Sequence, residues 1–212
     1  MTCPESGPSV DGLFSAALAK LRNGQEAWSE IVALQKRGDL VVFNEAAALL
    51  ESSDPATRRL GTIVLRELGE TPKDGERRFR DETVRLLIDH ITREKDTDVL
   101  GWMVSALGYH GGYEAIPHIV ALARSDSPEI RFNVAAALPY LSGSDKADSS
   151  VIESLELLAR DSDSDTRYYA LSGLQEIGVS VDQISETLSL LRKDLDPQVR
   201  SLALEYSPIS GN

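Results

Sequence analysis

Apolar residues recur along this chain at the three- and four-residue spacing of amphipathic helices, and no segment keeps the alternation expected of a strand. One phrase accompanies this spacing five times. It opens with an aspartate or serine, often followed by proline, and in four copies has arginine at its fifth position. The copies begin at residues 54, 96, 127, 163 and 196, so they lie 42, 31, 36 and 33 residues apart. Repeats of this length are typical of stacked helical pairs.

Each position of the phrase has a mechanical role. The opening aspartate or serine accepts a hydrogen bond from a free backbone N–H and so begins a helix. Proline at the next position, as at Pro55 and Pro197, costs little because the N–H that it lacks has no helical partner there. A small residue at the eighth position, as at Gly61 and Ala170, lets another helix approach closely. The phrase therefore predicts the second helix of each pair.

A first helix precedes each phrase. The helical period places these first helices at about residues 40–51, 79–93, 113–124, 151–160 and 181–192. Two more helices, near 12–22 and 25–37, lack the phrase and are expected to form an N-terminal cap that covers the first open face of the stack.

The phrase Asp-Pro-x-x-Arg, with a small residue and Leu-Gly later in the second helix, resembles HEAT repeats, especially the short phycobilisome-lyase type. The resemblance covers about residues 40–206. It implies an all-α fold, a right-handed α-solenoid of about five HEAT-like helix pairs plus an N-terminal helical cap. We expect a disordered N-terminus (1–10), capping helices (11–37), a repeat solenoid (38–207) that forms a single domain with the cap, and a C-terminal tail (208–212).

The resemblance also implies a structural ladder of charges. In such repeats the arginine at position five often pairs with an acidic residue of a neighbouring turn. The matching arginines here are Arg58, Arg131, Arg167 and Arg200, and the predicted partners are Asp54, Asp126, Asp163 and Asp196. Leu100 takes the place of the arginine in the second copy, so the ladder is expected to be interrupted there.

Second helices line the concave groove in this kind of fold, with positions six, seven and ten of the phrase facing the groove. A partner-binding surface is therefore predicted at Arg59, Trp102, Ser105, Phe132, Asn133, Tyr168, Tyr169, Ser172 and Glu205. Leu60 and Ile63 occupy equivalent positions. Aromatic side chains dominate binding hot spots because they combine a large contact area with few rotatable bonds. The alternative is that these rings only pack between adjacent helices.

The composition narrows the classes of function. Acidic residues outnumber basic ones by 34 to 22, for a net charge of -12, which argues against a nucleic-acid partner. The single cysteine, Cys3, fits a cytoplasmic location, and the apolar stretch at 13–21 is too short to cross a membrane. The sequence contains no phosphate-binding loop, nucleophile elbow or convergent His/Cys cluster. We therefore expect no catalytic residue, metal or cofactor.

The leading hypothesis is a non-catalytic interaction scaffold or adaptor that binds a protein or peptide in the groove, as a monomer. Two alternatives come from the resemblance, because HEAT-like proteins also include alkylpurine DNA glycosylases and bilin lyases. Trp102 and Arg59 on the predicted groove favour the glycosylase, and the net charge disfavours it. An aromatic groove able to stack a tetrapyrrole favours a bilin lyase or chaperone, but Cys3 is the sole thiol and lies near the end of the chain.

Overall fold

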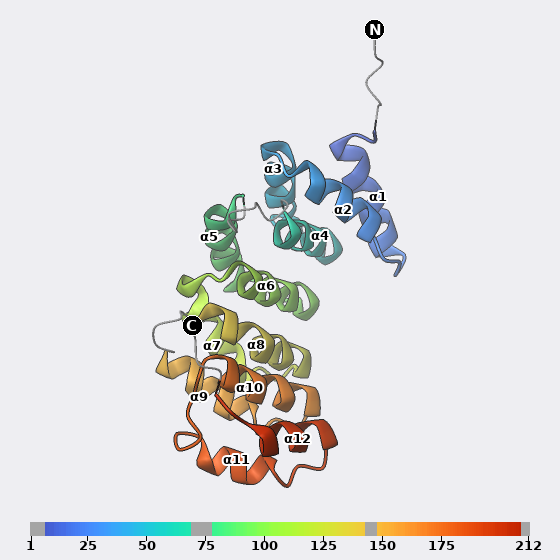
Figure 1. Ribbon diagram of the computed structural model, residues 1–212. Helices are drawn as coiled ribbons and strands as arrows, with labels where there is room; N and C mark the ends of the chain where they lie inside the picture. The colour runs from blue at the N-terminus through green and yellow to red at the C-terminus, as the bar shows by residue number, and fades with distance from the viewer. Residues whose placement is uncertain (1–6, 69–77, 143–147, 209–212) are drawn as a thin grey trace. The chain divides into compact units, whose positions relative to one another are not determined.

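The structure is a computed structural model that describes residues 7–68, 78–142 and 148–208. Within these ranges every regular element is a helix (Figure 1). The α-helices are α1 (Val10–Arg22), α2 (Trp28–Arg37), α3 (Leu40–Leu49), α4 (Pro55–Glu67), α5 (Arg80–Ile91), α6 (Thr97–His110), α7 (Ile116–Ala121), α8 (Pro128–Leu141), α9 (Ser149–Leu158), α10 (Ser164–Glu176), α11 (Ser185–Leu191) and α12 (Pro197–Glu205). The all-α fold predicted from the repeats is confirmed.

The chain divides into two compact units, residues 1–106 and 107–212. In the first unit, α1 packs against α2 and α3 against α4, and α4 also contacts both α1 and α2. In the second unit, α7 pairs with α8, α9 with α10 and α11 with α12. The helix α10 lies between α8 and α12, so three second helices stack side by side within this unit (Figure 1).

The helix starts follow the phrase closely. In four copies the side chain of the first residue accepts a hydrogen bond from a backbone N–H of the first helical turn, as in the contact from the Thr166 N–H to Asp163 at 2.8 Å. The residue two positions before the phrase accepts from the backbone N–H of the first residue in all five copies. These acceptors are Ser52, Glu94, Ser125, Asp161 and Asp194. Each turn is therefore fixed by two side-chain acceptors or, in the first copy, by one.

The helix predicted over 113–124 is shorter than expected. A 3-10 helix, η1 (Tyr113–Ala115), precedes α7, and a second, η2 (Leu122–Arg124), follows it. Gly111 adopts a positive φ of 63°, which ends the preceding helix, and Pro117 lies in the first turn of α7. At the N-terminus α1 already begins at Val10, with Ser9 as its cap. Cys3 and residues 209–212 of the predicted tail lie outside the described residues.

Two glycines mark places where helices touch backbone to side chain. A Cβ built on Gly61 of α4 would lie 2.6 Å from the carbonyl oxygen of Ala46 and 2.9 Å from the Cβ of Leu49, both on α3. A Cβ on Gly173 of α10 would lie 2.6 Å from a ring carbon of Pro139 on α8. Both distances are shorter than real Cβ contacts. The pairs α3–α4 and α8–α10 can therefore pack this closely only because glycine has no side chain.

We expect Gly61→Ala to lower the free energy of unfolding by about 1–3 kcal/mol, because α3 and α4 must separate to admit the methyl group. Urea denaturation followed by far-UV circular dichroism measures this change. Glu45→Ala is the matched control, since Glu45 is an exposed residue of α3. If Gly61→Ala matched that control or stabilised the protein, the close approach of α3 and α4 would be contradicted.

Candidate functional site

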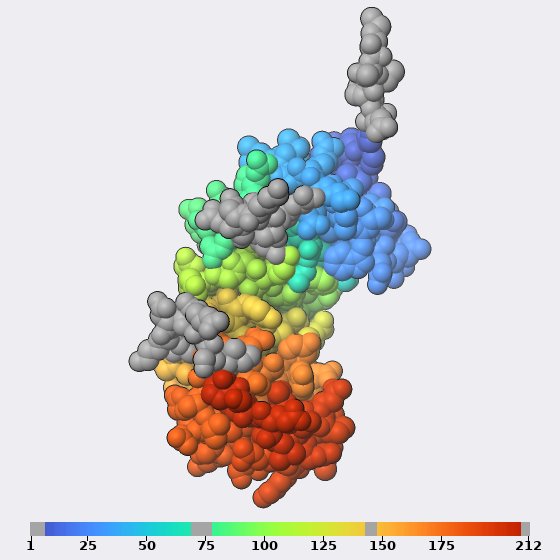
Figure 2. Space-filling view, in the orientation of Figure 1, coloured from blue at the N-terminus to red at the C-terminus, as the bar shows by residue number. Residues whose placement is uncertain are grey.

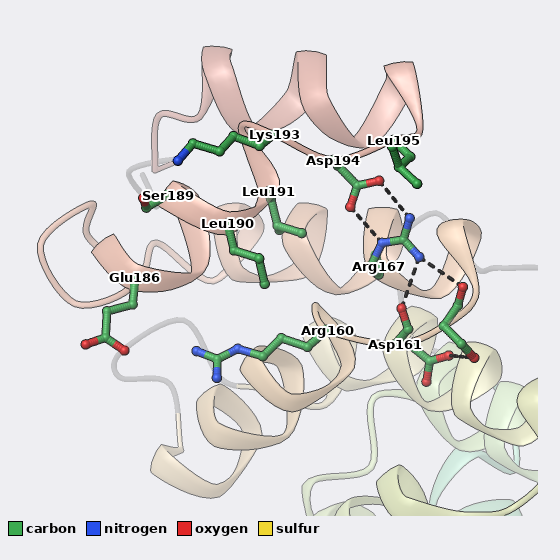
Figure 3. Close-up of a pocket in the computed structure, with 11 residues that line it drawn as sticks. Arg160, Asp161, Arg167, Glu186, Ser189, Leu190, Leu191, Lys193, Asp194 and Leu195 are labelled. Carbon is green, nitrogen blue, oxygen red and sulfur yellow. Dashed lines mark hydrogen bonds and ion pairs between the residues drawn. The ribbon is translucent and has the colours of Figure 1, made fainter.

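Arginine side chains join successive turns of the repeats. Arg167 of α10 donates two parallel hydrogen bonds to the carboxylate of Asp194, at 2.8 Å from Nε and 2.7 Å from Nη2. Its remaining Nη1 donates to the backbone carbonyls of Asp161 and Ser162 in the turn before its own helix. One guanidinium therefore holds the end of its own turn and the acidic side chain of the next turn (Figure 3).

The same geometry occurs at two other copies of the phrase. Arg58 binds both carboxylate oxygens of Glu94, at 2.7 and 2.8 Å, and the carbonyl of Ser52. Arg131 binds both oxygens of Asp161 from Nε and Nη2, and Nη1 donates to the carbonyl of Ser125. We call these three contacts, Arg58–Glu94, Arg131–Asp161 and Arg167–Asp194, the arginine ladder. The first contact lies in the first unit and the other two lie in the second.

The structure corrects the predicted acidic partners. The predicted aspartates Asp126, Asp163 and Asp196 do not form the ladder; the partner is the acidic residue two positions before the next phrase. Asp163 and Asp196 instead use their carboxylates to accept backbone N–H bonds at helix starts. A carboxylate held in that way points at the helix, so it cannot also meet the arginine side-on.

Asp54 is ion-paired, but with an arginine outside the phrase. Its Oδ2 lies 2.6 Å from Nη2 of Arg22 and accepts the hydroxyl of Thr57 at 2.7 Å. The hydrogen bond from Thr57, followed by that from Arg22, lowers the pKa of Asp54 to about 2. Arg200 has no carboxylate partner in the described residues and donates to the carbonyls of Asp194 and Leu195.

The ladder carboxylates are nearly buried, and their pKa values are low. Hydrogen bonds from Arg167 lower the pKa of Asp194, whose side chain is 9% exposed, and burial opposes this only in part. Burial alone would raise the pKa of Glu94, but Arg58 and two backbone N–H groups outweigh burial and lower it. The same balance, with Arg131 as the donor, lowers the pKa of Asp161. All three carboxylates are therefore charged in the folded protein at neutral pH.

The predicted groove residues fall into two groups, one in each unit. In the first unit, the guanidinium of Arg59 lies 5.9 Å from the ring centre of Trp102, and that of Arg66 lies 6.0 Å from it. Arg59 also pairs with Asp98 at 3.2 Å. Trp102 is half-buried, and both cations lie near its ring. Its ring is therefore already engaged by the protein's own side chains.

In the second unit three rings form one cluster on α8 and α10. Phe132 meets Tyr169 edge to face at 5.1 Å, and Tyr169 meets Tyr168 edge to face at 5.8 Å. Tyr168 and Tyr169 are 36% and 44% exposed, and Phe132 is half-buried. Within the described residues neither tyrosine hydroxyl has a hydrogen-bond partner. The rings pack on one another and still face solvent.

The other predicted residues are polar and accessible to different degrees. Ser105, Asn133 and Ser172 are half-buried, and Glu205 is exposed. The amide nitrogen of Asn133 donates to the carbonyl of Glu129 one turn earlier, and Glu205 accepts from the hydroxyl of Ser201. Leu60 and Ile63 are buried, so they do not face a groove. The reason is that α4 packs against α1 and α2 as well as α3.

A pocket that the sequence did not predict adjoins the Arg167–Asp194 contact. It is open, has a volume of about 690 Å³, and lies between the end of α9 and α11. Leu190 is 54% exposed on its wall and Leu195 is 96% exposed at its edge. The charged ends of Arg160 and Lys193 point to the side of Glu186, away from the ladder (Figure 3). The sequence does contain one signal for this pocket, the apolar Leu195 directly before the fifth phrase. In the other copies that position is polar, with Ser53, Lys95, Asp126 and Ser162.

Comparison with protein families decides what the repeats are. The family model described as HEAT repeats matches residues 84–156. Residues 84–156 therefore match HEAT repeats. This confirms the resemblance drawn from the phrase. No curated protein sequence matches the chain.

Solved structures similar to this chain share its fold at low sequence identity. The Escherichia coli protein YibA has a TM-score of 0.70 and 17% identity, over 96% of this chain and 76% of its own. A designed armadillo repeat protein in complex with peptide (KR)4 has a TM-score of 0.62 and 13% identity, over 90% and 96%. The complex of CpcE and CpcF of phycocyanin lyase from Nostoc sp. has a TM-score of 0.57 and 19% identity, over 79% and 99%. These likenesses establish a helical repeat solenoid.

Removing a ladder arginine should be costly. We expect Arg167→Ala to lower the free energy of unfolding by about 2–4 kcal/mol, because Asp194 would be left nearly buried without its cation. Chemical denaturation at neutral pH measures the loss. Arg160→Ala removes an exposed arginine from the same unit and should change stability by less than about 0.5 kcal/mol. Equal effects of the two substitutions would contradict a structural role for the ladder.

The ladder also predicts acid sensitivity. Each ladder carboxylate has a lower pKa in the folded chain than its ordinary value, which is 4.5 for Glu94 and 3.8 for Asp161 and Asp194. The folded state therefore binds fewer protons, so its stability is fully present above about pH 4.5 and is lost as the pH falls through the lowered values. Denaturation midpoints measured from pH 6 to pH 2 check this. The variant Arg167→Gln/Asp194→Asn should show a shallower loss, and an unchanged slope would contradict the assignment.

Proposed function

We propose that this HEAT-repeat protein is a non-catalytic scaffold that binds a protein or peptide on the exposed faces of its second helices. The observation that carries the proposal is the ring cluster of Phe132, Tyr168 and Tyr169. Large rings that stay exposed, with free hydroxyl groups, have little reason to remain on a water-facing helix unless they meet another surface.

The cluster has the physical properties of a binding hot spot. Tyrosine offers a broad apolar ring and a polar tip, and only two side-chain torsions must be fixed on binding. Tyr169 is already held edge to face on both sides, by Phe132 and by Tyr168. Because this packing limits ring motion before a partner arrives, the entropy lost on binding is small.

The structural comparisons support the class of function without naming a partner. The designed armadillo repeat protein is similar over 90% of this chain and is in complex with a peptide, and CpcE is in complex with CpcF. At 19% identity the likeness to phycocyanin lyase is one of fold, so it brings no lyase activity to this chain. Among the described residues, no helix combines the length and apolar character needed to cross a membrane. A cytoplasmic monomer is part of the proposal.

Site-directed photo-crosslinking tests the proposal. A benzophenone amino acid placed at Tyr169 should yield a discrete adduct in lysate of the source organism, and mass spectrometry should identify the partner. The purified partner should then bind the Tyr168→Ala/Tyr169→Ala variant about tenfold or more weakly than the wild type, as expected for truncating hot-spot rings.

The control places the same photo-reactive residue at Glu153, an exposed position on the first helix α9 of the same unit. That position should give no matching adduct. Adducts of equal yield at both positions, or full affinity after loss of both tyrosines, would contradict binding through the second helices.

A further inference from the structure

The second helices of the second unit carry acidic side chains that no cation neutralises. Four exposed carboxylates lie on α8, α10 and α12 without an ion pair in the described residues: Glu129, Asp165, Glu176 and Glu205. The basic residues of these three helices are the position-five arginines Arg131, Arg167 and Arg200, and each is directed to the turns. We call the exposed side of α8, α10 and α12, with its ring cluster and these carboxylates, the tyrosine face.

Two of these carboxylates lie where a helix disfavours negative charge. Glu176 is the last residue of α10 and Glu205 is the last residue of α12. The C-terminus of a helix carries partial negative charge, so a carboxylate there destabilises the helix slightly. Helix stability therefore explains Glu129 and Asp165, which lie in first turns, but it does not explain Glu176 and Glu205.

In the first unit an aromatic ring and a carboxylate on the second helices contact arginines of the same chain. There Trp102 lies within 6.0 Å of the guanidinium groups of both Arg59 and Arg66, and Asp98 is paired with Arg59. On the tyrosine face, within the described residues, no Lys or Arg lies over the rings. An aromatic ring attracts a cation through its negative face, and an unpaired carboxylate attracts it through charge. The tyrosine face has both kinds of acceptor and lacks the cation.

We infer that the tyrosine face binds a basic peptide segment, in which Arg or Lys side chains stack on Tyr168 and Tyr169 and pair with the surrounding carboxylates. This inference rests on the proposed scaffold function and specifies the chemistry of the partner. A cation that stacks on a ring and loses water contributes more binding free energy than a cation paired only with an exposed carboxylate. Arg is favoured over Lys because its planar group can stack and pair at once.

The dimensions suit a short extended segment. Packed helices lie about 8–10 Å apart, so α8, α10 and α12 together span about 20 Å. An extended chain rises about 3.3 Å per residue, so about six residues cross all three helices. The yellow, orange and red parts of this unit adjoin one another in the space-filling view (Figure 2), and α10 contacts both α8 and α12, so such a segment would cross neighbouring helices.

The pocket beside Leu190 has the opposite character. Arg160 and Lys193 have no ion pair with any described residue and lie beside exposed leucines and the exposed carboxylate of Glu186. Among its described lining residues there is no aromatic ring, so a cation cannot stack there.

Fluorescence anisotropy with the full chain tests the inference. The probes are labelled octapeptides of alternating Lys and Arg, of alternating Lys and Glu, and of alternating Ser and Gly. We expect the Lys/Arg peptide to bind and the other two to bind at least about tenfold more weakly. Glu176→Gln/Glu205→Gln should weaken binding of the Lys/Arg peptide by about threefold to tenfold, and Tyr168→Ala/Tyr169→Ala by about tenfold or more.

Matched variants separate this site from general attraction to an acidic protein. Glu153→Gln/Glu186→Gln removes the same charge from the first helices α9 and α11 and should change affinity by less than about twofold. Tyr168→Phe/Tyr169→Phe keeps the rings and should retain most of the affinity. Circular dichroism confirms that each variant is folded.

Equal weakening by the two charge variants, or equal binding of the Ser/Gly peptide, would overturn the inference. If the partner crosslinked at position 169 makes contact through a neutral or acidic segment, the basic chemistry is wrong and the scaffold stands. If no position-specific crosslink forms and the Lys/Arg peptide ignores the tyrosine substitutions, both proposals fail.

Discussion

The bidentate contact between a guanidinium and a nearly buried carboxylate is the interaction that orders these repeats. A carboxylate that is 4% or 9% exposed, as for Glu94 and Asp194, must receive several hydrogen bonds, because its lost hydration is otherwise unrecovered. The arginine supplies two of these bonds and also ties down the carbonyls at the end of its own turn. The packing of aliphatic side chains drives association of the helices, but it tolerates sliding. The ladder fixes which turn lies beside which.

Most of the fold could be predicted from the sequence, since the determining features are local. The phrase supplies a capping side chain, a proline that fits the first turn, and apolar residues at helical spacing, and all of these act within a dozen residues. The shortened helix α7 departs from the prediction for an equally local reason. Gly111, with its positive φ, ends the preceding helix, and Pro117 lies in the first turn of α7, so the α-helix begins later than predicted.

The ladder partners were mispredicted because one aspartate cannot serve two geometries. The opening aspartate of the phrase is conspicuous, but its oxygens are directed at backbone N–H groups of its own helix. In the acidic residue two positions earlier, one oxygen accepts a backbone N–H bond from the turn. Both of its oxygens also accept hydrogen bonds from the arginine of the previous copy. The sequence indicates this pairing, because the arginine and the acidic residue are lost together. Leu100, which cannot donate, is followed in the next copy by Ser125 instead of an acid. For the candidate site, periodicity placed Tyr168 and Tyr169 on an outward face, but it could not foresee that Leu60 and Ile63 are buried in a helix that packs against α1 and α2 as well as α3.

Because each rung is built from one residue in each of two copies, copies that carry both the arginine and the acidic residue can be joined in more than one way. Unequal recombination that removed residues 161–193 would bring Asp194 to the place of Asp161, opposite Arg131, with its turn and cap intact. Such a deletion would remove one helical pair and keep the residues of the remaining rung. The length of the repeat array, and with it the number of side-by-side second helices, is open to selection separately from the chemistry on their surface.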